Sequence, residues 1–274
     1  MFYNISIKGK MNNRYLTREE LLDAQLAMLK EIHRCCVDNG LTYYLAYGTL
    51  IGAIRHKGFI PWDDDVDIMM PLHDYEKLRV LYKSDRYFIA DCFLDRRHQL
   101  PFPRIYDGRT CMGDNDSSLG VSIDIYIMHG APNSQKKRAE HALEIMNLTK
   151  TYFLFSHLRS IMARHLFPFL WNQNESRLCT FFCKRLFQLL SKYKSEESKV
   201  LYPYSGEGLT DLIWKDFFDG ITLVDFNGEQ FYAPQRYHDV LSTTYGNYLK
   251  LPPEEDRHPY HGSEFYSWKS NMMF

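Results

Sequence analysis

The sequence lacks the features that mark several classes of protein. Its six cysteines form neither a Cys-x-x-Cys pair nor a zinc-finger spacing with histidine, which argues against a zinc domain and against a disulfide framework. No stretch approaches the about 20 uninterrupted apolar residues that a membrane-spanning helix needs. The amino-terminal residues also lack the basic start and apolar run of a secretory signal. We therefore expect a cytoplasmic protein.

A strong charge of one sign is missing as well. The chain carries 33 Lys and Arg against 34 Asp and Glu, for a formal net charge of −1, so broad electrostatic binding to nucleic acid is not expected. What is present is a hydrophobic share of 45% and an aromatic share of 15%, as in globular proteins. A chain of 274 residues can form one large domain or a core with a smaller lobe.

The most informative stretch is an acidic cluster in an apolar frame. Asp65 and Asp67 alternate around Val66, so in a β-strand their side chains share one face, with Cα atoms about 6.6 Å apart. Asp124 lies in a second such frame and could join them from a neighbouring strand about 4.8 Å away. Two carboxylates about 4 Å apart repel by about 4 kcal/mol, so the cluster calls for a cation. Oxygen ligands without Cys or His favour Mg²⁺ or Mn²⁺.

A Gly-Thr pair lies ahead of these acids. Gly48 allows a ligand to approach the backbone, and Thr49 is expected to cap a helix over residues 50–56, whose free N–H groups would favour an anion. A phosphate site is therefore predicted here. Basic residues at the other end of this helix either reach anionic substrate or form an ordinary helix C-terminus. These residues are Arg55, His56 and Lys57.

The acidic cluster has simpler interpretations. Asp63, Asp65 and Asp67 occupy the first three ligand positions of a calcium loop, but that loop needs Gly at its sixth position and Glu at its twelfth, where this chain has Ile68 and Asp74. A solvated turn with an aspartate capping the next helix is the second alternative. The third acid and the Gly-Thr pair favour a cation site over both.

Three segments together resemble a known family. Residues 45–75, which contain the stretch YGTLIGAIRHKGFIPWDDDVDIMMPLHDY, resemble the LicD family of phosphocholine transferases. Residues 120–132 (GVSIDIYIMHGAP) are similar to the family segment that carries a third acid, and residues 245–261 (YGNYLKLPPEEDRHPYH) are similar to its C-terminal signature. The resemblance covers most of the chain outside its middle, and it implies a nucleotidyltransferase-like fold.

The resemblance also implies an activity. It matches Asp65, Asp67 and Asp124 to the metal-binding and catalytic acids, and Gly48 with Thr49 to the element that holds phosphate. The donor would be CDP-choline or a related CDP-alcohol, and CMP would leave. The acceptor would be a hydroxyl of a cell-surface glycan precursor, such as teichoic acid, lipopolysaccharide or capsule. Whether Asp124 acts as a base or as a ligand of a second metal stays open, as does the choice among choline, ethanolamine, ribitol and glycerol.

Further residues have two interpretations each. Arg104 either contacts the donor diphosphate or pairs with a nearby acid. His261, in the C-terminal signature, is a candidate for substrate binding, although a lone histidine is more often structural. Two other functions also fit the acids: a glycosyltransferase, in which Asp65-Val66-Asp67 would bind a nucleotide sugar through a metal, and an inactive nucleotide-binding module.

Periodicity and turn residues predict an α+β or α/β fold with a small mixed sheet and helices packed on it. Thr17 and Glu20 form a capping box ahead of a first helix that stops at an Asn-Gly pair. A second helix is expected to start at Pro71, and a third to run from Pro234 to Gly246. Strands are expected at residues 41–46, 66–70, 87–92, 104–107 and 121–127, with a hairpin at 221–232.

The chain divides into three predicted parts. These are a catalytic core with an N-terminal helix (residues 1–133), a helical insert or lobe (134–215) and a C-terminal hairpin and helix that complete the active-site region (216–274). In the insert, aromatic and leucine side chains alternate with Arg159, Arg164 and His165. That pattern fits core packing, which we favour, or a basic amphipathic helix in peripheral contact with the inner face of the plasma membrane. Cys179 and Cys183 are expected to pack in the core rather than to bind a soft metal.

Overall fold

The computed structural model describes residues 14–113, 115–165, 177–205, 212–258 and 266–269, with side chains up to residue 158 in the first helix of the insert. The longer helices are α1 (Arg18–Asp38), α2 (Tyr47–Ile51), α3 (Leu72–Leu81), α4 (Gln135–His165), α5 (Arg177–Leu190) and α6 (Tyr237–Tyr245). A π-helix at Gly52–His56 continues α2, and short 3₁₀ turns lie at Ser195–Glu197, Lys215–Phe218 and Glu254–Asp256.

The strands form a mixed seven-stranded sheet and two small pairs. The main sheet has the strand order β1-β2-β6-β4-β3. Strand β7 pairs with both β6 and β8. Only β2 and β6 pair in parallel; the other pairs of this sheet are antiparallel. The strands are β1 (Tyr44–Leu45), β2 (Asp67–Pro71), β3 (Tyr87–Ala90), β4 (Arg104–Asp107), β5 (Thr110–Met112), β6 (Ser122–Gly130), β7 (Val200–Pro203), β8 (Ile213–Trp214), β9 (Ile221–Phe226), β10 (Glu229–Pro234) and β11 (Tyr266–Trp268).

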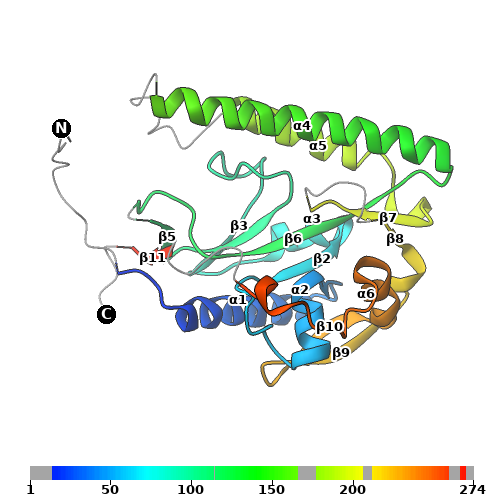
Figure 1. The fold of residues 1–274 in the computed structure, drawn as a ribbon, viewed down its shortest axis with the longest axis horizontal. Helices are drawn as coiled ribbons and strands as arrows, with labels where there is room; N and C mark the ends of the chain where they lie inside the picture. The colour runs from blue at the N-terminus through cyan, green and yellow to red at the C-terminus, as the bar shows by residue number, and fades with distance from the viewer. Residues whose placement is uncertain (1–13, 114, 166–176, 206–211, 259–265, 270–274) are drawn as a thin grey trace.

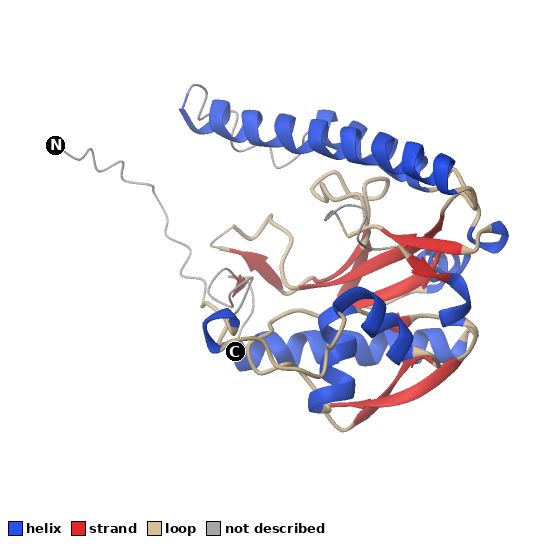
Figure 2. Cartoon of the chain, turned by 45° about the vertical axis from the view of Figure 1, so that its right-hand side comes forward, coloured by secondary structure: helices blue, strands red, loops and turns tan. Residues whose placement is uncertain are grey.

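Helices flank the sheet on two sides (Figure 1). Helix α1 lies along one side and packs on β6 and β4, while α4 and α5 form an antiparallel hairpin on the opposite side. Figure 2 shows the same arrangement from a second direction, with the hairpin extending beyond the strands. Buried residues of the sheet, of α1 and of the near half of the hairpin share one core, which includes Met28, Ile68, Ile125 and Leu186. The α+β prediction is confirmed.

Local signals correctly predicted several elements. Thr17 caps α1, its hydroxyl accepting from the Glu20 N–H, while the Glu20 carboxylate accepts from the Thr17 N–H. Strand β4 has the predicted bounds, and β9 and β10 form the predicted hairpin. Two expectations near the Gly-Thr pair were wrong. The strand before this pair has only two residues, and α2 starts at Tyr47, so Thr49 lies inside the helix and does not cap it.

Four strands were missed. Strands β7 and β8 extend the sheet beside β6, and β11 pairs with β5 from the far end of the chain. These strands have two to four residues each, too few for an alternating pattern to show in the sequence. Their pairing is also with distant residues, which no local signal specifies. The helix predicted over residues 50–56 corresponds to the end of α2 and the π-helix, and the change of helix type at Gly52 was not predicted.

Candidate active site

Strand register brings three predicted site residues together. Asp67, the first residue of β2, is the parallel register partner of Asp124 on β6. Arg104, the first residue of β4, is the antiparallel partner of the same Asp124 from the other side. Neighbouring strands lie about 4.8 Å apart, and register partners point to the same face of a sheet. Asp67, Asp124 and Arg104 therefore form a row across three adjacent strands.

The Asp67 carboxyl group is the electrostatic centre of this row. It is buried, and burial is the main cause that raises its pKa well above the usual value. The charges of Asp65, Asp124 and Asp63 raise the pKa further, and only Arg104 opposes them. Asp65 itself precedes β2 and is half-buried. Because each acid destabilises the ionised form of Asp67, the site is short of positive charge.

The Arg104 side chain forms an ion pair with Asp124. Its Nη2 donates to Asp124 Oδ2 at 2.9 Å, and its Nε lies 2.5 Å from Oδ1. The guanidinium also lies over the Phe102 ring, 5.6 Å from the centroid. Of the two interpretations of Arg104, the pairing with an acid is the one the structure contains. The pair holds the Asp124 carboxylate in one orientation next to Asp67.

The loop that carries the acids is anchored from α1. Arg18 donates to the Asp63 carbonyl at 2.7 Å, and the Gln25 amide donates to the Asp64 carbonyl at 3.2 Å. A Cβ at Gly48 would lie 2.6 Å from Asp63 Oδ2, so a larger residue would displace this carboxylate. The absence of a side chain at Gly48 therefore lets the acidic loop approach the backbone closely, whereas the sequence analysis expected a ligand there.

Thr49 has a structural task that its sequence position did not reveal. Its side chain is buried, and its hydroxyl accepts from the Asp67 N–H at 2.9 Å. This bond ties α2 to the start of β2. The preceding Tyr47 has a φ of 43°, a left-handed conformation that costs energy for a bulky side chain. Its hydroxyl donates to the Pro203 carbonyl, and its ring meets Tyr126 edge to face at 5.0 Å between centroids.

The basic end of the π-helix contacts the C-terminal signature. Arg55 donates to the Tyr248 carbonyl at 2.7 Å and to His56 Nε2 at 2.9 Å. Burial, and then the charge of Arg55, lower the pKa of His56, consistent with a neutral ring that accepts this bond. Lys57 is exposed and ends the π-helix in a left-handed conformation. Arg257 lies over the Trp62 ring at 5.4 Å, so the signature also reaches the loop before the acids.

Two tyrosines that the sequence analysis did not select belong to this site. Tyr126 donates to Asp124 Oδ2 at 3.2 Å, and its position two residues after Asp124 on the same strand was the signal that could have revealed it. Tyr266, on β11, has a pKa raised mainly by burial, with further effects from Arg104 and Asp124. No local pattern could have placed Tyr266 here. His261 lies outside the described residues.

The residues fit a hard cation in chemistry but do not enclose one. In the described part of the chain, no group of three or more His, Cys, Asp or Glu side chains is arranged closely enough to hold a metal ion. Asp124 is engaged by Arg104, which leaves Asp67 and Asp65 as the nearest acids. The raised pKa of Asp67 reflects repulsion that a divalent cation would relieve. Oxygen donors of this kind suit Mg²⁺ or Mn²⁺.

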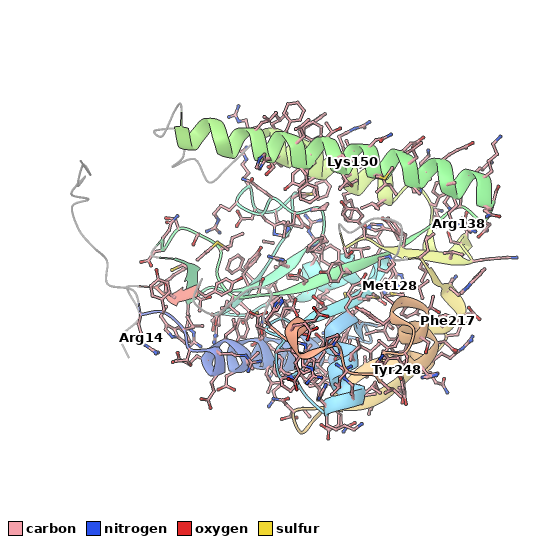
Figure 3. The ribbon with its side chains drawn as sticks, viewed as in Figure 1. Arg14, Met128, Arg138, Lys150, Phe217 and Tyr248 are labelled. Atoms are coloured by element: carbon pink, nitrogen blue, oxygen red, sulfur yellow. The ribbon has the colours of Figure 1, made fainter. Side chains whose placement is uncertain are left out.

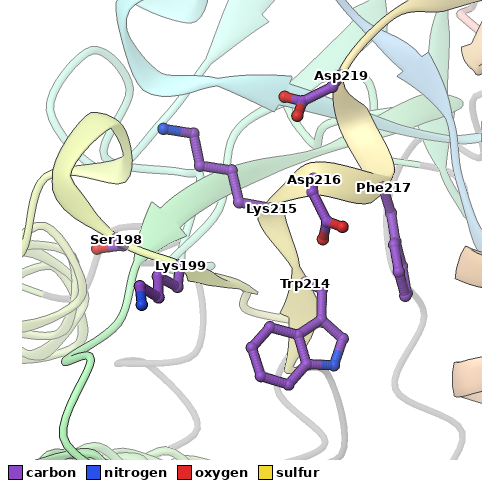
Figure 4. A pocket seen from close by; sticks show the side chains of 7 residues that line it. All are labelled: Ser198, Lys199, Trp214, Lys215, Asp216, Phe217 and Asp219. Atoms are coloured by element: carbon purple, nitrogen blue, oxygen red, sulfur yellow. The ribbon is translucent and has the colours of Figure 1, made fainter.

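A separate pocket of about 730 Å³ lies at the start of β7 and after β8 (Figure 4). It is lined by Ser198, Lys199, Trp214, Lys215, Asp216, Phe217 and Asp219. None of these is a predicted site residue. Two of its charged groups have partners, since Asp216 pairs with Arg236 at 2.7 Å and Lys215 donates to the Glu196 carbonyl. We therefore assign the acidic row, not this pocket, as the candidate active site.

Comparison with known proteins identifies the family of this chain. Residues 40–168 match the family model described as LicD/FKTN/FKRP, nucleotidyltransferase domain. This range contains Asp65, Asp67, Arg104 and Asp124. The chain is also 30% identical over 269 residues to the lipopolysaccharide cholinephosphotransferase LicD of Haemophilus influenzae, which covers 92% of this chain and 98% of that protein. The chain belongs to the LicD family.

Shorter matches lie in uncharacterised proteins of two further bacteria. The Rickettsia prowazekii protein is 46% identical over 108 residues, or 39% of this chain and 34% of that protein. The Rickettsia typhi protein is 34% identical over 64 residues, or 23% of this chain and 21% of that protein. Among the described helices, none is both long enough and apolar enough to cross a membrane.

Proposed function

We propose that this protein transfers phosphocholine, or a similar substituted phosphate, from a CDP-activated donor to a hydroxyl of a cell-surface glycan precursor and releases CMP. Similarity to the Haemophilus influenzae cholinephosphotransferase along nearly its whole length supports the transferred group and a lipopolysaccharide-type acceptor. The observation that carries the proposal is the register that places Asp67 beside Asp124. A transferase that handles a diphosphate needs a cation to neutralise its charge, and paired carboxylates would hold one.

Asp65 and Asp67 would hold a Mg²⁺ or Mn²⁺ ion, with Asp124 as a further ligand if its carboxylate turns from Arg104. A divalent ion held there supplies positive charge to the donor diphosphate and to the departing CMP. Gly48 and the N–H groups of α2 would bind donor phosphate, with Arg55, His56 and Lys57 contacting anionic substrate. His261 belongs to the same proposed substrate-binding set.

Asp124 has two possible tasks, and its contacts are compatible with both. As a base, its carboxylate would take the proton of the acceptor hydroxyl while Arg104 and Tyr126 fix its orientation. As a ligand, it would exchange the Arg104 guanidinium for the cation. Arg104 would position Asp124 only in the first case, and contact of Arg104 with the diphosphate would require this pair to open.

The acceptor would be a glycan or a lipid-linked glycan, as in lipopolysaccharide, teichoic acid or capsule synthesis. A lipid-linked acceptor would bring the protein into peripheral contact with the inner face of the plasma membrane. We also propose the division at residues 133 and 215 into a catalytic core, a helical insert and a C-terminal part.

Nucleotide release tests the proposal directly. The full chain is incubated with Mg²⁺, a panel of CDP-alcohols and sugar nucleotides, and a panel of glycan acceptors. Release of CMP from CDP-choline supports phosphodiester transfer, whereas release of UDP or another diphosphate would establish a glycosyltransferase instead. Asp65→Asn should abolish release, while Asp85→Asn, a change at an exposed aspartate remote from the acidic row, should not. Binding of nucleotide without turnover across both panels would indicate an inactive module.

A further inference from the structure

The distal half of the α4–α5 hairpin exposes large apolar side chains. On α4, the buried residues Ile145 and Tyr152 lie on one face, and Leu154 and Leu158 point in nearly the opposite direction at about 100° per residue. Leu154 is 57% exposed and Leu158 is 45% exposed. These leucines therefore do not serve the core. The sequence analysis favoured core packing for this segment, and for Leu158 that expectation was wrong.

Helix α5 repeats this arrangement. Cys179, Cys183, Leu186 and Leu190 form its buried face, as expected for the two cysteines. On the other side, Phe181 is 55% exposed, with the exposed Arg177 one turn before it and the exposed Arg185 one turn after it. Leu178 is exposed beside them. An exposed apolar side chain flanked by two arginines can contact both the acyl chains and the anionic headgroups of a membrane surface.

The two outward faces belong to one end of the hairpin. Phe155 on α4 stacks on Phe182 of α5 at 5.3 Å between centroids, which fixes the helices side by side there. In Figure 3, Lys150 marks the middle of α4, and the apolar positions follow it towards the end of the hairpin that extends beyond the sheet. We name Leu154, Leu158, Leu178 and Phe181, with Arg177 and Arg185, the hairpin patch.

Charge identifies the partner that suits the hairpin patch. Between residues 145 and 190 the sequence has one acidic residue, Glu175, and six basic ones. The basic residues are Lys150, Arg159, Arg164, Arg177, Lys184 and Arg185. An apolar surface with this surplus of positive charge complements a bilayer of anionic lipids, to which each Lys or Arg near the surface adds about 1 kcal/mol. In a two-fold pair of copies joined through this patch, two sets of arginines would be brought together with no acidic residue in the patch to pair with them.

We propose that the hairpin patch is a membrane-docking surface that binds anionic lipid. Leucine and phenylalanine side chains would enter the boundary between headgroups and acyl chains, and the arginines would contact lipid phosphates. Burying an exposed leucine contributes about 2 kcal/mol, so three or four such side chains suffice for reversible attachment. The proposal deepens the proposed function, because it names the surface at which a lipid-linked acceptor would be met.

Vesicle flotation tests the proposal without donor or acceptor. The full chain is mixed with vesicles of phosphatidylglycerol and phosphatidylcholine, or of phosphatidylcholine alone, and the bound fraction is measured at low and high salt. We expect binding to the anionic vesicles only, weakened by salt. Leu154→Gln with Phe181→Gln should lower the affinity by about tenfold or more, and Arg177→Gln with Arg185→Gln should lower it at low salt. The control Leu223→Gln changes a leucine that is 55% exposed on β9 and should bind like the unchanged protein.

Other outcomes would overturn the proposal. These are an absence of binding to either vesicle, equal binding by the Leu154→Gln and Phe181→Gln variant, and equal loss in Leu223→Gln. Sedimentation of the same proteins without lipid measures self-association; a dimer that only the hairpin variant abolishes, without vesicle binding, would make the patch an interface between copies. CMP release with a water-soluble acceptor is measured in parallel, and it should be unchanged in the hairpin variants. A failure of lipid binding and a failure of the transfer reaction are thereby separated.

Discussion

The acidic row and the hairpin patch depart from the usual distribution of residues in opposite directions. In the row, Asp67 is buried among other acids at the centre of the sheet. In the patch, leucine and phenylalanine side chains are exposed on helices whose opposite faces are packed. Buried like charge lowers the stability of an isolated chain, and clustered exposed apolar surface does not raise it. The comparison teaches that stability does not explain either region, so each is better explained by a ligand: a cation with a diphosphate for one, a lipid surface for the other.

The largest effect is expected from Asp67→Asn. Removing this carboxylate should lower CMP release by about a thousandfold, since charge stabilisation of this kind accounts for two to three orders of magnitude. Folding should be kept, because the amide removes repulsion from Asp65 and Asp124. Turnover is measured beside denaturant unfolding in metal-free buffer, with Asp85→Asn as the matched control. A marked loss of stability would show that the row is structural and end the comparison.

Arg104→Met tests whether Asp124 depends on its partner. The change leaves a carboxylate next to Asp67 without its guanidinium and should cost about 4 kcal/mol of unfolding free energy. Combining it with Asp124→Asn should recover part of that loss, because the repulsive charge is removed too. Urea unfolding of the two single variants and the double variant gives the coupling. Additive losses would mean that the two side chains do not act as a pair.

Acid should destabilise the fold through two buried histidines, His98 near Arg104 and Asp124 of the row and His129 against helix α5. Burial lowers the pKa of His98 to about 4 and that of His129 to about 3. Since the unfolded chain binds a proton near pH 6.5, the neutral rings contribute their full stability above that pH and lose it as the pH falls towards 4. For His98 the loss amounts to about 3 kcal/mol. Unfolding is followed by circular dichroism between pH 7 and pH 4; a flat profile would contradict the burial of these rings.

The smallest effect is expected on the outer face of the hairpin. Leu154→Gln should change the unfolding free energy by less than about 0.5 kcal/mol, as is usual for surface positions. Ile145→Ala, on the buried face of the same helix, should cost about 3 kcal/mol. Thermal unfolding of the two variants compares the faces directly. Equal losses would indicate that Leu154 packs in solution, which would remove the contrast on which the hairpin patch depends.

Sequence reasoning succeeded where the signal is local. Alternation around Asp67 and Asp124 predicted two acid-bearing strands, and the register of β2 and β6 brings the two acids side by side. The capping box at Thr17 and the Asn-Gly turn between β9 and β10 each depend on a few neighbouring residues, and both were correctly predicted. The roles in substrate and metal binding stay predictions.

The remainder depended on distant partners. The sequence predicted Thr49 as a helix cap, but its hydroxyl accepts from the Asp67 N–H. This bond forms because β2 lies against α2, which the local sequence does not specify. Arg104 had two candidate partners in the sequence, and the register of β4 with β6 selected Asp124. The exposure of Leu154 follows from what α4 packs against, which periodicity alone does not give, since apolar residues lie on both faces of the helix.

Strand β11 links the far end of the chain to the acidic row. It pairs with β5, the Leu16 N–H donates to the Tyr266 carbonyl, and the pKa of Tyr266 responds to Arg104 and Asp124. Removing residues from the C-terminal end of the chain, or attaching a bulky tag there, should therefore alter turnover as well as lower solubility.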